Sequence, residues 1–213
     1  ERAKRDPDAR FNSLAHLVDE AALGRAFHRI REDAAVGVDG ITKEQYGQQL
    51  EDKIVQGALR EVLEAIYEQD FLECSYGFRP KRSAHDALRA MNKMVSRERI
   101  TVILEADVQA FFDRVDRKKL LELLQIRVAD PPFLRLIGKC LNVGVLDGGE
   151  FSKPEERPAQ GSSIAPMFCY VYLHSVLDLW LEHDIPPRLK GHARLIRFAD
   201  DFLLVFERQD DAV

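Results

Sequence analysis

Cysteine is scarce in this sequence, and the cysteines present are poorly placed for cross-linking or for zinc. The three residues, Cys74, Cys140 and Cys169, are odd in number and far apart, without the short spacing of metal-binding motifs. We therefore expect neither a disulfide framework nor a zinc site, but reduced thiols buried as small apolar side chains. The six histidines are equally scattered, and we assign them no chemistry.

Long hydrophobic runs are also lacking. No apolar stretch approaches the roughly 18 to 20 residues that a membrane-spanning helix requires. The chain begins with charged residues, including Glu1, Arg2 and Lys4, and not with the apolar stretch of a signal peptide. We expect an intracellular protein without a membrane partner.

An excess of basic residues is the third absence: 31 Lys and Arg stand against 36 Asp and Glu, for a net charge of -5. Because phosphate binding relies on clustered basic side chains, this balance counts against an extensive nucleic-acid surface. Two local basic runs still leave room for a basic groove, although such runs more often mark solvated faces. The runs are Arg79, Lys81, Arg82, and then Arg188, Lys190, Arg194, Arg197.

Hydrophobic periodicity predicts a mixed fold. With 213 residues, of which 46% are hydrophobic, the chain is long enough for one domain with two lobes. Helical periods cover residues 12–32, 52–67, 84–97, 116–128, 131–140 and 163–183, and short apolar strands cover residues 100–108, 195–199 and 202–206. The glycines within residues 143–151 predict a hairpin. This order indicates the α+β class with an antiparallel sheet.

Acidic residues stand where two of these strands end. Asp200 and Asp201 lie between apolar strands, where adjacent carboxylates repel unless cations or solvent neutralise them. Taken alone, the pair is more often a solvated turn. Asp107 ends the strand before it, however, and acidic residues at neighbouring strand ends are what a two-metal phosphoryl-transfer site needs. Asp113 and Asp116 fit turn and helix-capping roles better.

Several motifs occur around these carboxylates in a fixed order. They are Ser75-Tyr76-Gly77-Phe78-Arg79-Pro80, then Asp107 with Phe111 and Phe112 four and five positions later, then Gln160-Gly161 before a helix, and finally Phe198-Ala199-Asp200-Asp201. The ordered set resembles reverse transcriptases, in particular those encoded by bacterial group II introns. A Gln-Gly pair alone is weak, whereas the first string and the order of the set are specific.

The resemblance implies a fold and an activity. The fold would be a right-hand polymerase, with an N-terminal extension and fingers in residues 1–99 and a palm in residues 100–213, where a small antiparallel palm sheet packs on helices. The thumb and the maturase region would lie outside this chain. The activity would be RNA-directed DNA polymerisation with two Mg²⁺ ions, or Mn²⁺, extending a DNA primer with dNTPs on an RNA template such as intron RNA. The bacterial cytoplasm is the implied location, and a homodimer stays an open alternative.

The resemblance also implies roles for individual residues. Asp107, Asp200 and the carbonyl of Val108 would bind the metal ions, with Asp201 as a weaker ligand. The nucleotide would meet Phe111, the steric gate Phe112, and the Gln160-Gly161 loop. Template and primer would contact Arg79, Arg82 and Phe198, although Arg79 could equally brace the fold through a buried carboxylate.

The sequence departs from the family pattern near residues 47–51, where a longer basic segment with triphosphate-binding side chains usually stands. Either that segment is omitted from this sequence or it is lost, and the abrupt junction favours omission. Phe198 replaces the usual Tyr, and Ala159 replaces the usual Pro. A different class of function is an RNA-binding maturase-type scaffold that assists splicing. A nucleotide cyclase fits poorly, because the Ser75 to Pro80 motif would go unexplained.

Overall fold

The computed structural model describes residues 2–30, 43–108, 115–142 and 163–212, with the side chains of residues 43–49 and 142 left out. Its residues form two compact units, each built from two separate segments of the chain. The first unit comprises Glu1–Gln69 and Phe112–Met167, and the second comprises Asp70–Phe111 and Phe168–Val213. The expected division into fingers and palm at residue 100 stays a prediction.

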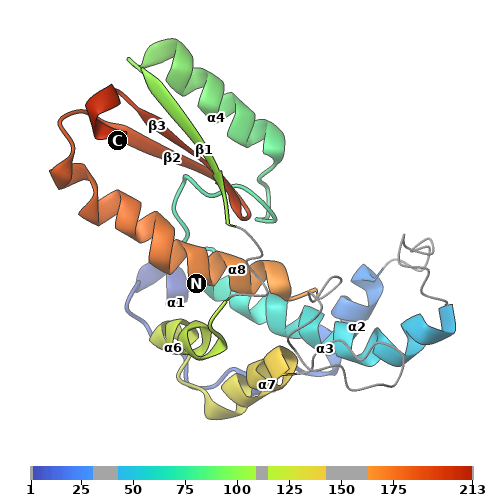
Figure 1. Cartoon of the computed structure of the whole chain (residues 1–213). Coiled ribbons are helices and arrows are strands. Elements are labelled where there is room, and N and C mark those ends of the chain that lie inside the picture. Colours follow the sequence, from blue (N-terminus) through green and yellow to red (C-terminus); the bar gives the residue numbers. More distant parts are fainter. Residues whose placement is uncertain (1, 31–42, 109–114, 143–162, 213) are drawn as a thin grey trace. The chain divides into compact units, whose positions relative to one another are not determined.

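The described part of the first unit is helical (Figure 1). Its elements are α1 (Arg2–Arg5), η1 (Ala15–Leu17), α2 (Glu20–Arg29), α3 (Lys43–Tyr67), α6 (Arg117–Arg127), α7 (Pro131–Asn142) and the first turn of α8 (Ala165–Leu173). α3 begins earlier than the predicted helix and runs through residues 47–51 without a break.

Aspartates set the helix starts in this unit. Asp116 accepts hydrogen bonds from the backbone N–H groups of Lys118 and Lys119, as expected for the cap of α6. The single helix predicted over residues 12–32 is wrong at its start. The side chain of Asp19 caps α2, so this helix begins only at Glu20, after the short 3₁₀ turn η1.

Small residues let α2 and α3 approach closely. Ala22, Ala26 and Ala58 form one buried cluster, and a β-carbon on Gly57 would stand 3.0 Å from the β-carbon of Ala26. The larger apolar side chains buried in this unit include Leu59, Leu63, Leu120, Leu124, Phe133 and Ile137. Burying side chains of this size supplies roughly 1.5 to 3 kcal/mol each, which makes the helical layer the main hydrophobic core of the unit.

The second unit contains a three-stranded antiparallel sheet, so the expected mixed class with an antiparallel sheet is confirmed. β1 (Val102–Asp107), β2 (Ala193–Phe198) and β3 (Asp201–Phe206) follow the order β1-β3-β2. α4 (Ala84–Arg97) contacts β2 and has the same bounds as the helix predicted there. Its start is fixed because the side chains of Ser83 and Asp86 each accept a hydrogen bond from the other's backbone N–H. Figure 1 shows α4 running beside the strands.

The long helix predicted over residues 163–183 changes its winding along the way. α8 ends at Leu173, and two π-helical stretches follow, η2 (His174–Asp178) and η3 (Trp180–Asp184). Short 3₁₀ turns, η4 (Pro186–Arg188) and η5 (Gln209–Asp211), flank the β2–β3 hairpin. Single-turn π stretches inside helices often accompany functional sites, and Asp178 of η2 accepts a hydrogen bond from Arg197 of β2.

The cysteines are free thiols, as expected. Cys169 is buried, whereas Cys74 and Cys140 are partly buried. Burial raises the pKa of the Cys169 thiol to about 12, so it stays protonated at neutral pH. Within the described ranges, no helix is both long enough and apolar enough to cross a membrane.

Candidate active site

The β1 and β3 strands place two of the expected carboxylates opposite each other. Asp107 is the last residue of β1 and pairs in register with Asp201, the first residue of β3. Directly opposite residues project to the same face of an antiparallel sheet, so both side chains lie on one face. Asp200 is the second residue of the two-residue loop before β3, and its carbonyl accepts a 3.3 Å hydrogen bond from the Val108 N–H. Sequence reasoning placed both aspartates in this loop, but Asp201 belongs to the strand.

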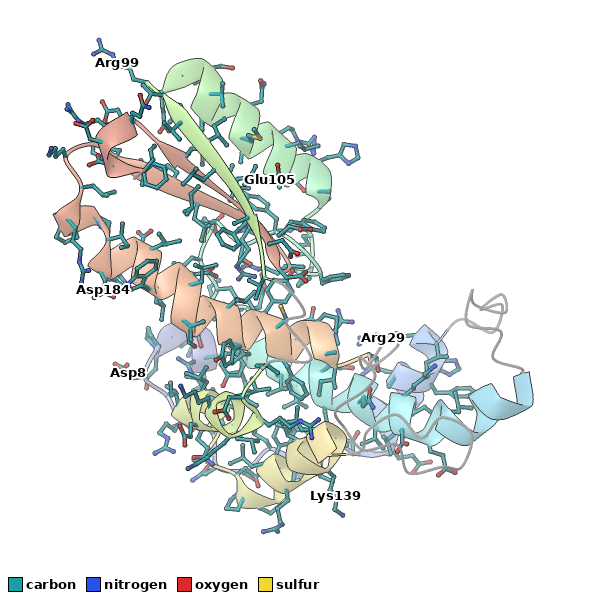
Figure 2. All side chains as sticks on the ribbon, in the orientation of Figure 1. Asp8, Arg29, Arg99, Glu105, Lys139 and Asp184 are labelled. Carbon is teal, nitrogen blue, oxygen red and sulfur yellow. The ribbon has the colours of Figure 1, made fainter. Side chains whose placement is uncertain are left out.

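The negative charges at this end of the sheet repel one another. Glu105 of β1, labelled in Figure 2, lies two residues before Asp107. Residues two apart in a strand project to the same face, so Glu105 adds a further negative charge there. Partial desolvation, followed by the charges of Asp200, Asp107 and Glu105, raises the pKa of Asp201. Among the described residues, no Lys, Arg or His side chain forms an ion pair with Asp107, Asp200 or Asp201.

The chemistry of this donor set fits a hard divalent cation. Carboxylate oxygens are the ligands that Mg²⁺ prefers, and a cation would remove the repulsion that raises the pKa of Asp201. As placed, however, no three His, Cys, Asp or Glu side chains in the described segments gather closely enough to hold a metal ion. Asp107 and Asp201 face each other across β1 and β3, and a cation site would need Asp200, from the adjacent loop, as a third ligand.

The loop that carries Asp200 is strained. Ala199 has a φ of 61°, a left-handed value that non-glycine residues rarely adopt. A positive φ at the first of two loop residues matches the type II′ hairpin, which usually has glycine there. An alanine in this region costs on the order of 1 to 2 kcal/mol, so neighbouring contacts have to hold the loop in place.

One set of contacts comes from the segment that contains the Ser75 to Pro80 motif. The Arg197 N–H donates to the carbonyl of Cys74, and the Tyr76 N–H donates to the carbonyl of Arg197, each at 2.8 Å. A β-carbon on Gly77 would stand 2.7 Å from the backbone nitrogen of Ala199. The motif therefore lies directly against the hairpin, and only glycine fits at its third position.

The aromatic residues of both motifs also meet here. The rings of Phe78 and Phe198 lie 6.3 Å apart between centroids, and Phe78 is 60% exposed. Phe198 pairs with Asp201 in register and thus lies on the carboxylate face of the sheet. Phe198 is partly buried, so Phe78 is the ring of this pair that is open to stack against a nucleotide base beside the acidic turn.

The two expected template arginines are engaged within their own loop. Arg79 is buried and donates from Nη1 to the carbonyls of Leu72 and Ser75, at 2.7 and 2.9 Å. These backbone carbonyls let Arg79 brace its own loop. Arg82 is mostly buried, pairs with Glu73 and donates to the Glu73 carbonyl at 2.9 Å.

A buried ion pair supports the hairpin from the opposite face. Arg197 is 0% exposed and donates from Nε and Nη2 to both carboxylate oxygens of Asp178, at 2.8 and 2.6 Å. Burial favours neutral Asp178, but the hydrogen bonds from Arg197 prevail and lower the pKa of Asp178. The inclusion of Arg197 in a basic surface run is therefore wrong, because its charge is neutralised in the interior.

Sequence reasoning missed the roles of Gly77 and of the Arg197 and Asp178 pair. The available signal was a charge inside each of two apolar segments, the strand before Ala199 and the helix after Cys169. Buried charges are nearly always paired, which is how the two could have been linked. Four expected residues, Phe111, Phe112, Gln160 and Gly161, lie outside the described residues, as does Ala159.

Comparisons with known proteins agree with the motif order. The family model for the reverse transcriptase (RNA-dependent DNA polymerase) matches residues 47–213. The chain is 41% identical over 132 residues to an uncharacterized 91 kDa protein in a cob intron of Schizosaccharomyces pombe, covering 62% of this chain and 16% of the relative. It is 35% identical over 137 residues to the group II intron-encoded protein LtrA of Lactococcus lactis, which covers 62% of this chain and 22% of the relative.

A third relative is the nuclear intron maturase 2 of Arabidopsis thaliana, 31% identical over 114 residues, covering 52% of this chain and 15% of the relative. The chain thus spans less than a quarter of the length of each of these three relatives. The family match covers more than half of the chain and includes the carboxylate hairpin and the Ser75 to Pro80 motif. The chain belongs to the reverse transcriptase family, with homology to group II intron-encoded proteins and maturases.

Proposed function

We propose that this chain carries the nucleotidyl-transfer centre of an RNA-directed DNA polymerase from a group II intron-like retroelement. The observation that carries the proposal is the pairing of Asp107 with Asp201 beside the Asp200 loop, three carboxylates without a basic partner in the described segments. Family membership supports the activity, with an RNA template, a DNA primer and dNTPs as its substrates. The right-hand arrangement, with fingers in residues 1–99 and a palm in residues 100–213, is part of the same proposal.

The roles of the residues follow from their positions. Asp107, Asp200, Asp201 and the Val108 carbonyl would hold two Mg²⁺ ions, which supply charge neutralisation and an acidified primer hydroxyl when bound. The β1–β3 pairing sets the spacing of Asp107 and Asp201, and the loop contacts set that of Asp200. Phe198 and the exposed Phe78 would present ring faces to primer or template bases, and Arg82 would contact a backbone phosphate.

The first test is primer extension by the complete protein on an RNA template with Mg²⁺. Asp200→Ala should reduce extension at least about a hundredfold, because it removes charge stabilisation from the reacting phosphate, while RNA binding is retained. Asp116→Ala is the matched control, since this aspartate only caps α6 and its loss should leave extension unchanged. Equal extension by the parent and Asp200→Ala would refute the proposed function.

A second test concerns sugar selectivity. By its position five residues after Asp107, Phe112 is proposed to exclude the ribose 2′-hydroxyl from the nucleotide pocket. Phe112→Ala should therefore raise incorporation of ribonucleotides relative to deoxynucleotides. Unchanged selectivity in an otherwise active variant would remove this role.

The alternative is an RNA-binding scaffold of the maturase type. One relative is named a maturase, and the overall charge of -5 provides little basic surface for a long template. The primer-extension test separates the two functions. A complete protein that binds RNA and promotes splicing, but extends no primer under any divalent cation, would favour the scaffold.

A further inference from the structure

The buried pair of Arg197 and Asp178 has a third partner. While Nε and Nη2 of Arg197 are bound by Asp178, Nη1 donates a 2.9 Å hydrogen bond to the backbone carbonyl of Ala199. Ala199 is the residue with the left-handed φ, immediately before Asp200. A single guanidinium thus joins the π-helical stretch η2 to the loop that carries a proposed metal ligand.

The sheet register separates this pair from the carboxylates. Arg197 pairs with Phe202, and Phe202 pairs with Ala106, so Arg197 projects to the face opposite Asp107 and Asp201. The guanidinium therefore does not neutralise the proposed metal ligands. It acts on the loop backbone, where the fixed fork of arginine provides three bonds in one plane.

Several contacts restrict how Arg197 can move. Its guanidinium carbon lies 5.1 Å from the centroid of the Tyr170 ring, and its own backbone is bonded on both sides to Cys74 and Tyr76. Both Arg197 and Asp178 have fully buried side chains. The guanidinium therefore has little freedom to reorient. Because Asp178 fixes its position, Asp178 also fixes the position of the Ala199 carbonyl.

We propose that Arg197, oriented by Asp178, is a positioning residue that holds the backbone of the Ala199 and Asp200 loop at the end of the sheet where Asp107 and Asp201 lie, so that Asp200 can serve as a metal ligand. This inference rests on the proposed function, since it assumes that Asp200 binds a divalent cation. Without the Arg197 bond, the strained φ of Ala199 would relax and Asp200 would leave its place beside Asp107 and Asp201.

The test must separate positioning from simple stability. Removing one member leaves an unpaired buried charge, whereas replacing both by apolar side chains of similar size commonly preserves the fold. The main variant is therefore the double substitution Arg197→Met with Asp178→Leu. Arg197→Lys is the second variant, because one ammonium can keep the pair with Asp178 but cannot also reach Ala199. Arg194→Met is the matched control, since Arg194 lies exposed on the same strand.

The readouts are thermal unfolding, Mn²⁺ binding by electron paramagnetic resonance without nucleic acid, and steady-state primer extension by the complete protein. Provided that they fold, the double variant and the Arg197→Lys variant should each bind Mn²⁺ about tenfold more weakly than the parent. In primer extension, both should have a lower kcat and an unchanged KM for dNTPs. Arg194→Met should match the parent in all three.

Parent-like Mn²⁺ binding in either folded variant would overturn the positioning role and leave the proposed function standing. If the double variant fails to unfold cooperatively, the Arg197→Lys result decides by the same criterion. A parent protein that neither binds Mn²⁺ nor extends a primer would instead remove the proposed function, and this inference with it.

Discussion

Gly77 lies so close to Ala199 that any side chain at position 77 would collide with the Asp200 loop. A β-carbon built on Gly77 stands 2.7 Å from the Ala199 nitrogen and 2.5 Å from the Tyr170 hydroxyl oxygen. The Ser75 to Pro80 motif is therefore a support for the hairpin, and its glycine is required by contact with backbone and not by an unusual φ.

Gly77→Ala should destabilise the protein by roughly 1 to 3 kcal/mol, because the backbone of the hairpin has to shift to admit the methyl group. Primer extension should fall further than the stability loss explains, since the shift displaces Asp200. Gly138→Ala is the control, because apart from its chain neighbours and the adjacent backbone of α7 no heavy atom lies within 4 Å of the place its methyl group would occupy. Helix propensity should raise the stability of this variant by up to about 1 kcal/mol. Urea denaturation measures the free energy of unfolding of both variants. Equal values for Gly77→Ala and Gly138→Ala would contradict the close contact between Gly77 and Ala199.

Asp201→Asn should stabilise the metal-free protein by about 0.5 kcal/mol, because it removes one of two like charges that face each other across β1 and β3. The pKa of Asp201 is raised, so its charge destabilises the fold above that pKa, and the repulsion disappears as the pH falls through it. The advantage of the variant should thus be present at pH 7 and vanish below about pH 4, the ordinary range of an aspartate in the unfolded chain.

Saturating Mg²⁺ should reverse this order at pH 7, since the parent gains binding energy that the variant gains only in part. Thermal unfolding of the parent and the variant at both pH values, with and without Mg²⁺, gives their stabilities under all four conditions. A parent that is more stable than Asp201→Asn without any divalent cation would count against the repulsion.

Asp130→Asn should destabilise the protein by about 1 to 3 kcal/mol at pH 7. Asp130 is buried, and although desolvation opposes its charge, hydrogen bonds from the Leu14, Ala15 and Phe133 N–H groups lower its pKa. A depressed carboxyl pKa contributes stability above the ordinary value of about 3.9 and loses it as the pH falls through the native value. The gap between parent and variant in urea denaturation should therefore narrow below about pH 4; a gap independent of pH would refute the ionised role.

Arg79→Lys should lower stability by roughly 1 to 3 kcal/mol, because an ammonium cannot replace the bonds of Arg79 to the Leu72 and Ser75 carbonyls. If Arg79 only braces its loop, removing its charge in Arg79→Ala leaves the salt dependence of RNA binding unchanged. A contact to a template phosphate would instead appear as a salt slope that is smaller by about 0.7 in Arg79→Ala. Binding titrations at several salt concentrations, beside unfolding curves, distinguish the two roles.

Local chemistry determined much of the fold from the sequence alone. The capping pair of Ser83 and Asp86 defines where α4 starts, and Asp116 does the same for α6, because caps satisfy N–H groups that a helix leaves unpaired. Short apolar runs located the strands, and the ordered motifs led to the reverse transcriptase family.

Only the tertiary structure decided which of these residues meet. The register places Asp201 opposite Asp107, although sequence reasoning ranked it below Asp200, because pairing between distant strands sets the partner of each residue. From the sequence, Arg197 is grouped with surface arginines. In the structure it is buried and pairs with Asp178, nineteen residues earlier. The spacing of residues along the chain does not predict such contacts, because distant segments become neighbours only when the chain packs into its tertiary structure.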